Sequence, residues 1–307
     1  METVLITGVS GFLGRYIARL FFEKGGIVVG ISSSSFENAP TTSLKIYRSL
    51  KLPDPRFADV LKEYSPTLCI HCAGRASVGA SVEEPDADFY TNTALTFEVL
   101  NTLRLHAPFC KFIFLSSAAV YRNPQHLPIS EDQPIAPLSP YGFHKFQCEQ
   151  LCLEFSKVYE LRTASVRIFS AYGPGLRRQV LWDICQKALT QPLICLQGTG
   201  RESRDFIHAL DVAKALLVIA DKAPMNGEAY NLGSGEETRI DCLASLVINS
   251  LNLDTEPVFS GVVPVGTPLN WKANISKISN LGFNPSVPLE RGVKIFANWC
   301  QAELIGY

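Results

Sequence analysis

The stretch TGVSGFLG, residues 7–14, decides the fold of this chain. An apolar run from Thr3 to Thr7 leads into it and predicts a strand, and a helical pattern follows from about Gly11 to Lys24. A glycine-rich turn between a first strand and a first helix is the position in which a βαβ unit binds a dinucleotide. The stretch therefore predicts a dinucleotide-binding turn.

The three glycines of this turn each have a separate task. Gly8 permits a tight turn, Gly11 lets the backbone approach a pyrophosphate, and Gly14 allows the helix to pack closely on the strand. The first turn of the helix then offers unpaired N–H groups and a partial positive charge to the phosphates. A carboxylate for the ribose is expected about 20 residues further on.

Outward from this turn, short β-rich runs alternate with longer helical stretches. Alternation of this kind predicts βαβ units and a parallel sheet wound on both faces, and continuous apolar runs indicate strands that are covered on both sides. We expect strands at 27–31, 44–47, 67–71, 111–116 and 163–168, and helices at 86–105 and 140–159.

The pattern loses its regularity after Tyr172-Gly173-Pro174-Gly175. The strands expected there, 193–196 and 257–258, are short and isolated. The predicted fold is therefore α/β, with a Rossmann-type doubly wound parallel sheet and a smaller C-terminal substrate-binding lobe. Residues 1–169 form the dinucleotide-binding domain, to which part of 204–233 returns, and 170–307 form mainly the lobe.

Composition excludes several classes of function. Of the 307 residues, 47% are apolar and 19% charged, which is typical of a globular protein, and the net charge of -1 does not fit a nucleic-acid binder. No apolar run reaches the roughly 18 residues that a membrane span needs. The N-terminus has no basic segment typical of a signal peptide. The nine cysteines form no framework, so we expect a cytoplasmic protein with reduced thiols.

A second group of residues indicates oxidation–reduction chemistry. Tyr141 and Lys145 are four residues apart, which is one helical turn, so both side chains lie on one face. A nearby ammonium favours the phenolate form of a tyrosine, which can then exchange a proton with a substrate hydroxyl. Ser116 and Ser117 supply hydroxyl donors at the end of a strand, where ligands of open α/β sheets bind.

Together these motifs resemble the extended short-chain dehydrogenase/reductase family, and within it the UDP-glucose 4-epimerases and related nucleotide-sugar enzymes. The similarity covers nearly the whole chain. It rests on the following stretches: 7–14 (TGVSGFLG), 71–74 (HCAG), Asn92, 116–121 (SSAAVY), 139–145 (SPYGFHK), 167–175 (RIFSAYGPG) and 204–208 (RDFIH).

The resemblance implies roles for individual residues. Tyr141 is the acid/base, Ser117 the catalytic hydroxyl donor, and Lys145 tunes Tyr141 and binds the nicotinamide ribose. His71 and Cys72 are packing residues, and we expect no metal site. The implied cofactor contacts are Gly8, Ser10, Gly11, Phe12, Leu13, Gly14, Ser32, Ser33, Ala73, Gly74, Asn92, Tyr141 and Lys145. The implied substrate contacts are Ser77, Ser117, Ser170, Arg177 and Arg204.

The identity of the cofactor depends on the end of the second strand. Ser32 stands 18 positions after Gly14, where a carboxylate would favour NAD. Hydroxyl groups of a serine run could bind a 2′-phosphate instead, with charge from Arg15 or Arg48. The expected cofactor is NAD or NADP, with a slight preference for NADP.

Three departures from the family pattern bear on the reaction. Ala118-Ala119 lack the carboxylate that 4,6-dehydratases use, so dehydration is excluded. Ser170 replaces the asparagine usual after Arg-x-Phe, and residues 263–268 lack the arginine that clamps the diphosphate in epimerases. Arg178 could compensate, as could Arg177.

Two enzyme reactions and one non-catalytic function remain. In a nucleotide-sugar 4-epimerase, which the stretch Ser77 to Ser81 favours, NAD oxidises C4 transiently and stays bound. In a reductase of a nucleotide-linked 4-keto-6-deoxy sugar, NADPH is consumed. A dinucleotide-sensing protein without activity is disfavoured, because Ser117, Tyr141 and Lys145 are all present. We also expect a homodimer through the helices at 86–105 and 140–159, by analogy with similar enzymes.

Overall fold

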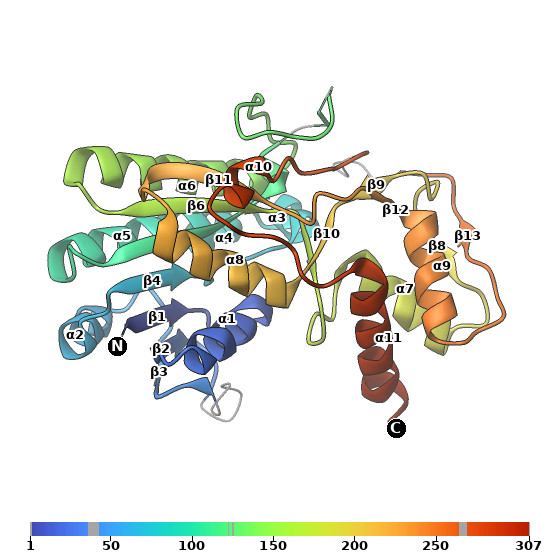
Figure 1. Ribbon diagram of the computed structural model, residues 1–307, viewed down its shortest axis with the longest axis horizontal. Coiled ribbons are helices and arrows are strands. Elements are labelled where there is room, and N and C mark those ends of the chain that lie inside the picture. Colours follow the sequence, from blue (N-terminus) through green and yellow to red (C-terminus); the bar gives the residue numbers. More distant parts are fainter. Residues whose placement is uncertain (1, 36–42, 122, 125, 264–268, 307) are drawn as a thin grey trace.

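The computed structural model describes residues 2–35, 43–121, 123–124, 126–263 and 269–306. A sheet of seven parallel strands, in the order β3-β2-β1-β4-β5-β6-β11, forms its centre (Figure 1). The strands are β1 (Thr3–Thr7), β2 (Ile27–Ser32), β3 (Ile46–Ser49), β4 (Leu68–His71), β5 (Lys111–Ser117), β6 (Thr163–Ile168) and β11 (Asn226–Leu232). This is the predicted Rossmann-type fold.

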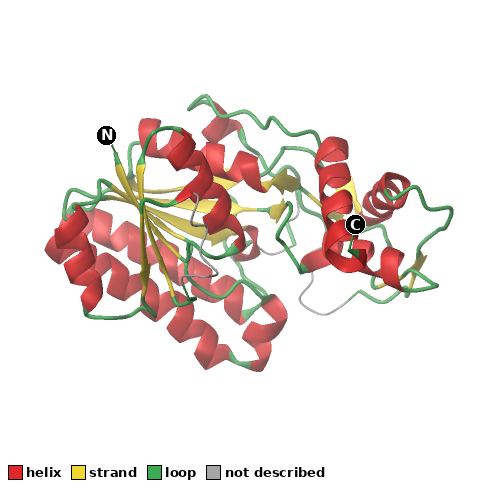
Figure 2. Ribbon diagram, turned by 90° about the horizontal axis from the view of Figure 1, so that it is seen from below, coloured by secondary structure: helices red, strands yellow, loops and turns green. Residues whose placement is uncertain are grey.

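Helices cover both faces of the fan of strands (Figure 2). On one face, α1 (Phe12–Glu23) and α8 (Ala209–Lys222) share a hydrophobic core with the sheet. On the other face, the core contains residues of α2 (Arg56–Tyr64), α5 (Leu95–His106) and α6 (Pro140–Tyr159). Because β4 is buried along its whole length and β5 at every position except its two ends, residues 68–70 and 112–115 read as continuous apolar runs.

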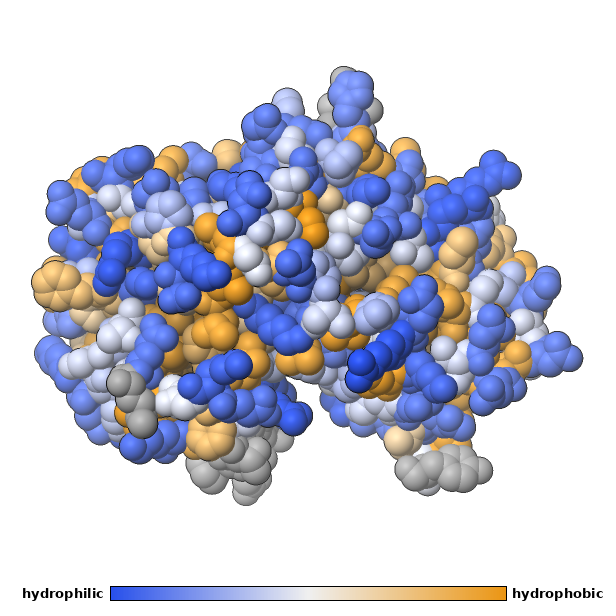
Figure 3. Space-filling model, in the orientation of Figure 1, coloured by the Kyte–Doolittle hydropathy of each residue, from blue (hydrophilic) through white to orange (hydrophobic). Residues whose placement is uncertain are grey.

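The order of the strands reverses between β1 and β4. In a parallel sheet of this kind, the crevice at the carboxyl ends of the strands beside the reversal is where ligands bind. The glycine-rich turn follows β1, and residues 72–77 follow β4, so both belong to this crevice. The space-filling view shows a notch between the body that contains α1 and the lobe that contains α11, on the side toward which β1 ends (Figure 3).

The helix expected at 86–105 is built from three successive pieces. These are α4 (Pro85–Phe89), a π-helical segment at Tyr90–Ala94, and α5. A π turn contains one residue more than an α turn, and such turns occur often at functional sites. The buried Asn92 lies in the middle of this one.

The smaller lobe is more regular than the sequence indicated. Three helices, α7 (Gln179–Thr190), α9 (Ile240–Ser250) and α11 (Leu289–Ile305), share a separate hydrophobic core. The strands expected to be isolated, β8 (Cys195–Leu196) and β13 (Val258–Phe259), pair with each other in parallel. That expectation was wrong because the partners are more than 60 residues apart.

Short elements complete the crevice. The α3 helix (Val78–Glu83) follows β4, and a 3-10 helix (Ala118–Val120) follows β5. Two further pairs, β7 (Ser170–Tyr172) with β10 (Phe206–His208) and β9 (Ser203–Arg204) with β12 (Thr238–Arg239), run from the sheet into the lobe, and α10 spans Ser276–Ser279. Among the described residues, no helix is long and apolar enough to cross a membrane.

The third strand begins two residues later than expected, at Ile46 rather than Leu44. Leu44 packs on the neighbouring strand instead, where a β-carbon added to Gly30 would lie 3.1 Å from its Cδ1. The segment 206–232 contains β10, α8 and β11, and β11 pairs with β6 at the edge of the main sheet.

Candidate active site

The glycine-rich turn is packed so tightly that it admits no side chains at two positions. Gly8 has a φ of +68°, and a β-carbon added to it would lie 2.7 Å from the Ala73 nitrogen. One added to Gly14 would lie 2.4 Å from the carbonyl oxygen of Gly8. Gly11 caps α1 without a side chain, and the first turn of α1 contains no acidic residue. This helix N-terminus can therefore accept an anionic group such as a pyrophosphate.

A buried amide near this turn has no hydrogen-bond partner among the residues that the structure describes. Asn92 is only 1% exposed, and neither polar atom of its side chain forms a hydrogen bond with a described residue. A β-carbon added to Gly74 would lie 2.6 Å from Asn92 Oδ1, so the amide rests against the exposed loop that follows β4. Buried polar groups are almost always satisfied, and an orphan amide in this crevice fits a dinucleotide passing over Gly74. The residues present therefore fit NAD or NADP.

Serine hydroxyls form a cluster at the end of β2. Ser32 Oγ lies 2.5 Å from Ser10 Oγ, and Ser34 Oγ lies 3.1 Å from the same atom. The Arg15 Nε donates to the Ser10 carbonyl at 2.8 Å, which brings a cation to this cluster. Arg48 instead pairs with Glu63 and Tyr64. Ser33 is exposed beside the cluster, and residues 36–42, which follow, lie outside the described residues.

Tyr141 lies in the first turn of α6, and hydrogen bonds fix that turn. Ser139 caps the helix by accepting from the Gly142 N–H at 3.2 Å. Ser81, in α3, accepts from the backbone N–H of Tyr141 at 3.1 Å and donates to the Val78 carbonyl. A β-carbon added to Gly142 would lie 2.4 Å from the carbonyl oxygen of Ala119. The turn that contains Tyr141 is therefore in close contact with the turn that follows Ser117.

Lys145 and Ser117 meet the same end of β5. The Lys145 ammonium donates to the Leu115 carbonyl at 2.9 Å and lies 4.7 Å from the centre of the Phe114 ring. It is also 5.8 Å from the centre of the Tyr141 ring. The Ser117 hydroxyl accepts from the Ala119 N–H at 3.1 Å. The structure thus brings the predicted triad to the carboxyl end of β5, at the same edge of the sheet as the glycine-rich turn.

His71 and Cys72, at the end of β4, have the properties of packing residues. The Nδ1 of His71 lies 2.7 Å from the Thr7 hydroxyl, and burial lowers the pKa of His71 to about 3. Burial raises the pKa of the Cys72 thiol to about 12, so it stays protonated. Within the described ranges, no three His, Cys, Asp or Glu side chains are grouped so that they could hold a metal ion.

The predicted substrate residues lie on several different elements around the crevice. Ser77 caps α3 in the loop after β4, and Ser170 lies on β7, where its N–H donates to the Asp205 carbonyl. Arg204 donates to the carbonyls of Ser203 and Leu269 and stacks 5.6 Å above the Trp271 ring. Burial lowers the pKa of Arg204 to about 10, against the opposing charge of Glu202.

Arg177 and Arg178 point in different directions. Arg177 pairs with Glu303 near the end of α11 and stacks on Trp299. Its guanidinium group is therefore held against α11 at the exposed surface of the lobe, where the Arg177 side chain is 58% exposed. Arg178 donates to the Ala76 carbonyl at 2.9 Å and therefore joins the lobe to the loop after β4. Residues 264–268, most of the stretch without the clamping arginine, lie outside the described residues.

Two residues that support Tyr141 carry no motif of their own in the sequence. They are Ser81 in α3 and Glu149, which lies two helical turns beyond Tyr141 in α6. Their contacts are made with distant segments, so spacing alone could not assign them. The one signal for Glu149 is its position: residues four apart on a helix lie on one face, so Glu149 shares the face of Lys145 and Tyr141.

Known proteins resemble this chain over its whole length. A sequence model of the NAD dependent epimerase/dehydratase family matches residues 4–233. A protein of Methanocaldococcus jannaschii described as a putative UDP-glucose 4-epimerase is 28% identical, covering 96% of this chain and 97% of its own. The UDP-glucuronate 4-epimerase of Thermodesulfobacterium geofontis is 27% identical, covering 99% and 98%.

Solved structures of nucleotide-sugar epimerases have the same fold as this chain. The UDP-N-acetylglucosamine 4-epimerase of Methanobrevibacter ruminantium, in complex with UDP-N-acetylmuramic acid, superposes with a TM-score of 0.89 at 26% identity, covering 99% of each chain. The UDP-glucose 4-epimerase of Thermotoga maritima with UDP-glucose gives the same TM-score and identity and covers 99% of this chain and 100% of its own.

Proposed function

Since this chain belongs to the NAD dependent epimerase/dehydratase family, we propose that it epimerises the hexose of a nucleoside diphosphate sugar at C4, with a dinucleotide that stays bound. One observation carries the proposal: the turn of α6 with Tyr141 is in contact with the turn after Ser117, at the same edge of the sheet as the glycine-rich turn. Proton transfer and dinucleotide binding then occur in one crevice.

The residues of the chain divide the work as follows. Tyr141 removes the proton from the hydroxyl at C4 and later returns a proton to the same oxygen. The Ser117 hydroxyl donates a hydrogen bond to this oxygen, and the Lys145 ammonium holds the ribose. A dinucleotide bound by the glycine-rich turn and Lys145 would supply the reversible hydride transfer that this proton transfer accompanies. The 4-keto sugar must rotate between these steps, so the pocket has to hold the diphosphate more firmly than the hexose.

We propose a UDP-sugar as the substrate. The support is that relatives at 27–28% identity are described as UDP-hexose or UDP-hexuronate 4-epimerases. Arg204, stacked on Trp271, would bind the diphosphate, and Ser77 and Ser170 would contact the sugar. Arg178 would take the place of the missing clamping arginine, since its guanidinium reaches the loop after β4.

The preference for NAD or NADP is a separate proposal. Structures of MoeE5, which is 25% identical to this chain, contain NAD. In this chain, the serine cluster at the end of β2 offers hydroxyls and a neighbouring Arg15 in place of a carboxylate. Such a site does not repel a 2′-phosphate. We expect both dinucleotides to bind, NADP somewhat more tightly; equal affinity in a calorimetric titration would remove this preference.

The function is tested with the purified protein and no added cofactor. The dinucleotide released on denaturation is identified, and UDP-glucose and UDP-galactose, then the corresponding uronates, are incubated with the native protein. We expect retained dinucleotide and interconversion of the C4 epimers. An empty site that exchanges NADPH freely would favour the second candidate, a one-way reductase of a nucleotide-linked 4-keto sugar.

The acid/base assignment is tested by Tyr141→Phe. General acid–base catalysis contributes about 10²- to 10⁴-fold, so we expect kcat to fall by about that factor. The fold should persist, because Ser81 contacts the backbone rather than the phenol of Tyr141. Activity that survives this change intact would contradict the assignment.

We also propose that the protein is a homodimer. Large apolar side chains are exposed along α4, the π-helical segment, α5 and α6. This outer aromatic patch consists of Phe89 (38% exposed), Tyr90 (67%), Phe97 (41%) and Phe143 (51%). Exposed apolar groups on packed helices favour association with a second copy.

A further inference from the structure

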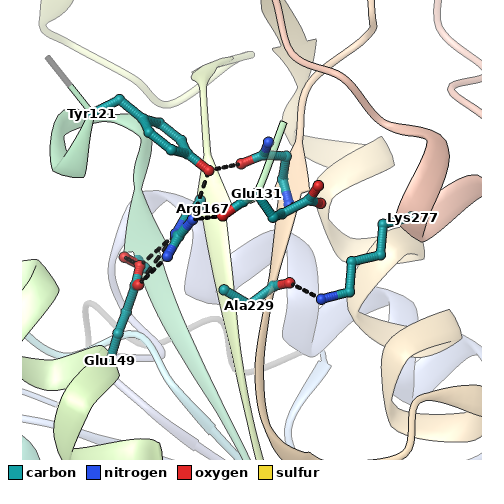
Figure 4. A network of polar contacts seen from close by, with 8 residues as sticks. Tyr121, Glu131, Glu149, Arg167, Ala229 and Lys277 are labelled. Atoms are coloured by element: carbon teal, nitrogen blue, oxygen red, sulfur yellow. Dashed lines mark hydrogen bonds and ion pairs between the residues drawn. The ribbon is translucent and has the colours of Figure 1, made fainter. Parts of the chain in front are cut away.

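A buried ion pair lies directly behind the active site. Glu149 is on α6 and Arg167 on β6, and their side chains are only 5% and 7% exposed. Arg167 holds the carboxylate as a fork, with Nε 3.1 Å from both carboxylate oxygens and Nη2 2.8 Å from Oε2 (Figure 4). Although burial opposes it, the hydrogen bonds and charge of Glu149 raise the pKa of Arg167. Bidentate pairs of this kind fix geometry.

The pair is bonded to the strand that contains Ser117. In the register of β5 and β6, Ser116 lies opposite Arg167 and Ser117 opposite Ile168. The Ser116 hydroxyl donates to Oε1 of Glu149 at 2.5 Å. Because successive strand residues face opposite sides, Ser116 turns toward α6 while Ser117 turns away from it.

The pair is bonded also to the connection between Ser117 and Tyr141. Arg167 Nη1 donates to the Tyr121 hydroxyl at 2.6 Å and to the Glu131 carbonyl at 3.2 Å. The Tyr121 hydroxyl donates to Asn231 Oδ1, and the Asn231 N–H donates to the Glu131 carboxylate, both at 2.8 Å. One guanidinium therefore holds the beginning and the middle of this connection against β6 and β11 (Figure 4).

A contribution to stability does not by itself explain why this position holds an ion pair. A buried ion pair can often be replaced by apolar residues without loss of stability, because desolvation offsets the attraction. Here the pair joins four segments that have to agree in position: β5, α6, β6 and the 121–139 connection. Tyr141, Lys145 and Glu149 lie one turn apart along α6, so a shift of Glu149 along its axis moves Tyr141 as well.

We propose that Glu149 and Arg167 are positioning residues for proton transfer, setting the distance between the Ser117 hydroxyl and the Tyr141 phenol through Ser116 and Tyr121. The inference rests on the proposed function, since it assumes that these two groups act on one substrate oxygen. Neither Glu149 nor Arg167 touches the substrate in this scheme.

Ser116→Ala is the sharpest test, because it removes one hydrogen bond and leaves both charges paired. In the holoenzyme we expect kcat for 4-epimerisation to fall about fivefold, with KM and the bound dinucleotide unchanged. Glu149→Gln should lower kcat by more, about 10- to 100-fold, and Glu149→Asp, which restores the charge but not the reach, should recover only part of the loss.

Asp211→Asn provides a matched control. Asp211 is also a buried carboxylate, 1% exposed, but its partners are Lys214, Ser286 and Val287, none of which belongs to the proposed site. We expect this variant to lose thermal stability while the folded fraction keeps its kcat. If Ser116→Ala and Glu149→Gln behave in the same way, the pair is only structural and the proposal is overturned.

Crystal structures give a readout that does not depend on the substrate. The separation between Ser117 Oγ and Tyr141 Oη should be larger in Ser116→Ala than in the wild type. An unchanged separation overturns the positioning role even if the wild type proves to have no epimerase activity. Wild-type protein that fails to epimerise UDP-sugars, with the separation altered in the variant, would instead contradict the proposed function alone.

Discussion

At Gly142, the addition of a single methyl group would disturb the candidate active site. It follows Tyr141, and the oxygen of Ala119 lies where its β-carbon would be. The first turn of α6 can therefore approach the strand end with Ser117 only because this position has no side chain. Overpacking of this kind typically costs about 1–3 kcal/mol, since the backbone has to move.

We predict that Gly142→Ala lowers the free energy of unfolding by about 1–3 kcal/mol and kcat by about tenfold or more. Gly79→Ala is the control, because nothing lies within 4 Å of the β-carbon it would add in α3. That change should stabilise the protein by up to about 1 kcal/mol and leave kcat unaltered. Urea unfolding and steady-state kinetics measure both quantities; equal behaviour of the two variants would contradict the close contact.

His71 makes stability depend on pH. Its pKa is lowered by burial from 6.5 to about 3, so the unfolded chain takes up a proton at a pH where the folded chain does not. This group therefore has no effect above pH 6.5, and stability is lost as the pH falls from 6.5 toward 3. One pKa unit corresponds to about 1.4 kcal/mol, so the loss from pH 7 to pH 5 should be about 2 kcal/mol.

The prediction is checked by urea unfolding of the wild type and of His71→Gln at pH 7 and pH 5. Between pH 7 and pH 5, the free energy of unfolding of the variant should fall by about 2 kcal/mol less than that of the wild type. His126→Gln, which changes an exposed histidine, should follow the wild type. A variant His71→Gln with the wild-type pH dependence would show that another group causes the acid sensitivity.

At the scale of secondary-structure elements, the sequence predicts those features that depend on residues close together in the chain. The turn at 7–14 and the pair Tyr141 and Lys145 could be found because the spacing of a few residues fixes their geometry. The helix at 86–105 was predicted as one element, yet its π-helical segment was not, because an inserted residue leaves the apolar pattern on both sides intact. The pairing of β8 with β13 depends on distant sequence and left no local signal.

The outer aromatic patch gives the prediction for the elements α4 to α6. A charge at its centre, Phe97→Glu, should convert a dimer to a monomer, since an unpaired buried carboxylate is costly. Phe109→Glu changes an even more exposed phenylalanine, 83% exposed, in the loop after α5, and should leave the assembly unchanged. Size-exclusion chromatography with light scattering distinguishes the two. A wild type that is monomeric at all concentrations would end the proposal of a dimer.

At the scale of the whole molecule, the site is completed by contacts between the lobe and the sheet. Arg178 reaches the Ala76 carbonyl across the crevice, whereas its neighbour Arg177 remains on the lobe with Glu303. The sequence presented the two arginines as equivalent candidates, because adjacent residues cannot be separated without knowing how α7 is oriented. The fold could be predicted from the sequence; the different contacts of these two arginines depend on tertiary packing.

We predict that Arg178→Ala raises KM for the nucleotide sugar about tenfold, with a smaller effect on kcat, because it loosens the lobe from the loop after β4. Arg177→Ala should leave KM unchanged and cost at most about 1 kcal/mol of stability, as exposed ion pairs contribute little. Steady-state kinetics with both variants decides between them. A raised KM in Arg177→Ala alone would assign the substrate contact to Arg177 after all.

The π-helical segment at 90–94 means that one inserted or deleted residue decides whether Asn92 faces the crevice. The segment contains one surplus residue relative to an α-helix that joins the same two ends. Deleting a single codon there would leave α4 and α5 in rotational phase, so their core contacts would survive. The wide turn that presents Asn92 to Gly74 would vanish. A deletion of one residue in this helix would therefore preserve the fold but remove the buried amide of Asn92 from the crevice.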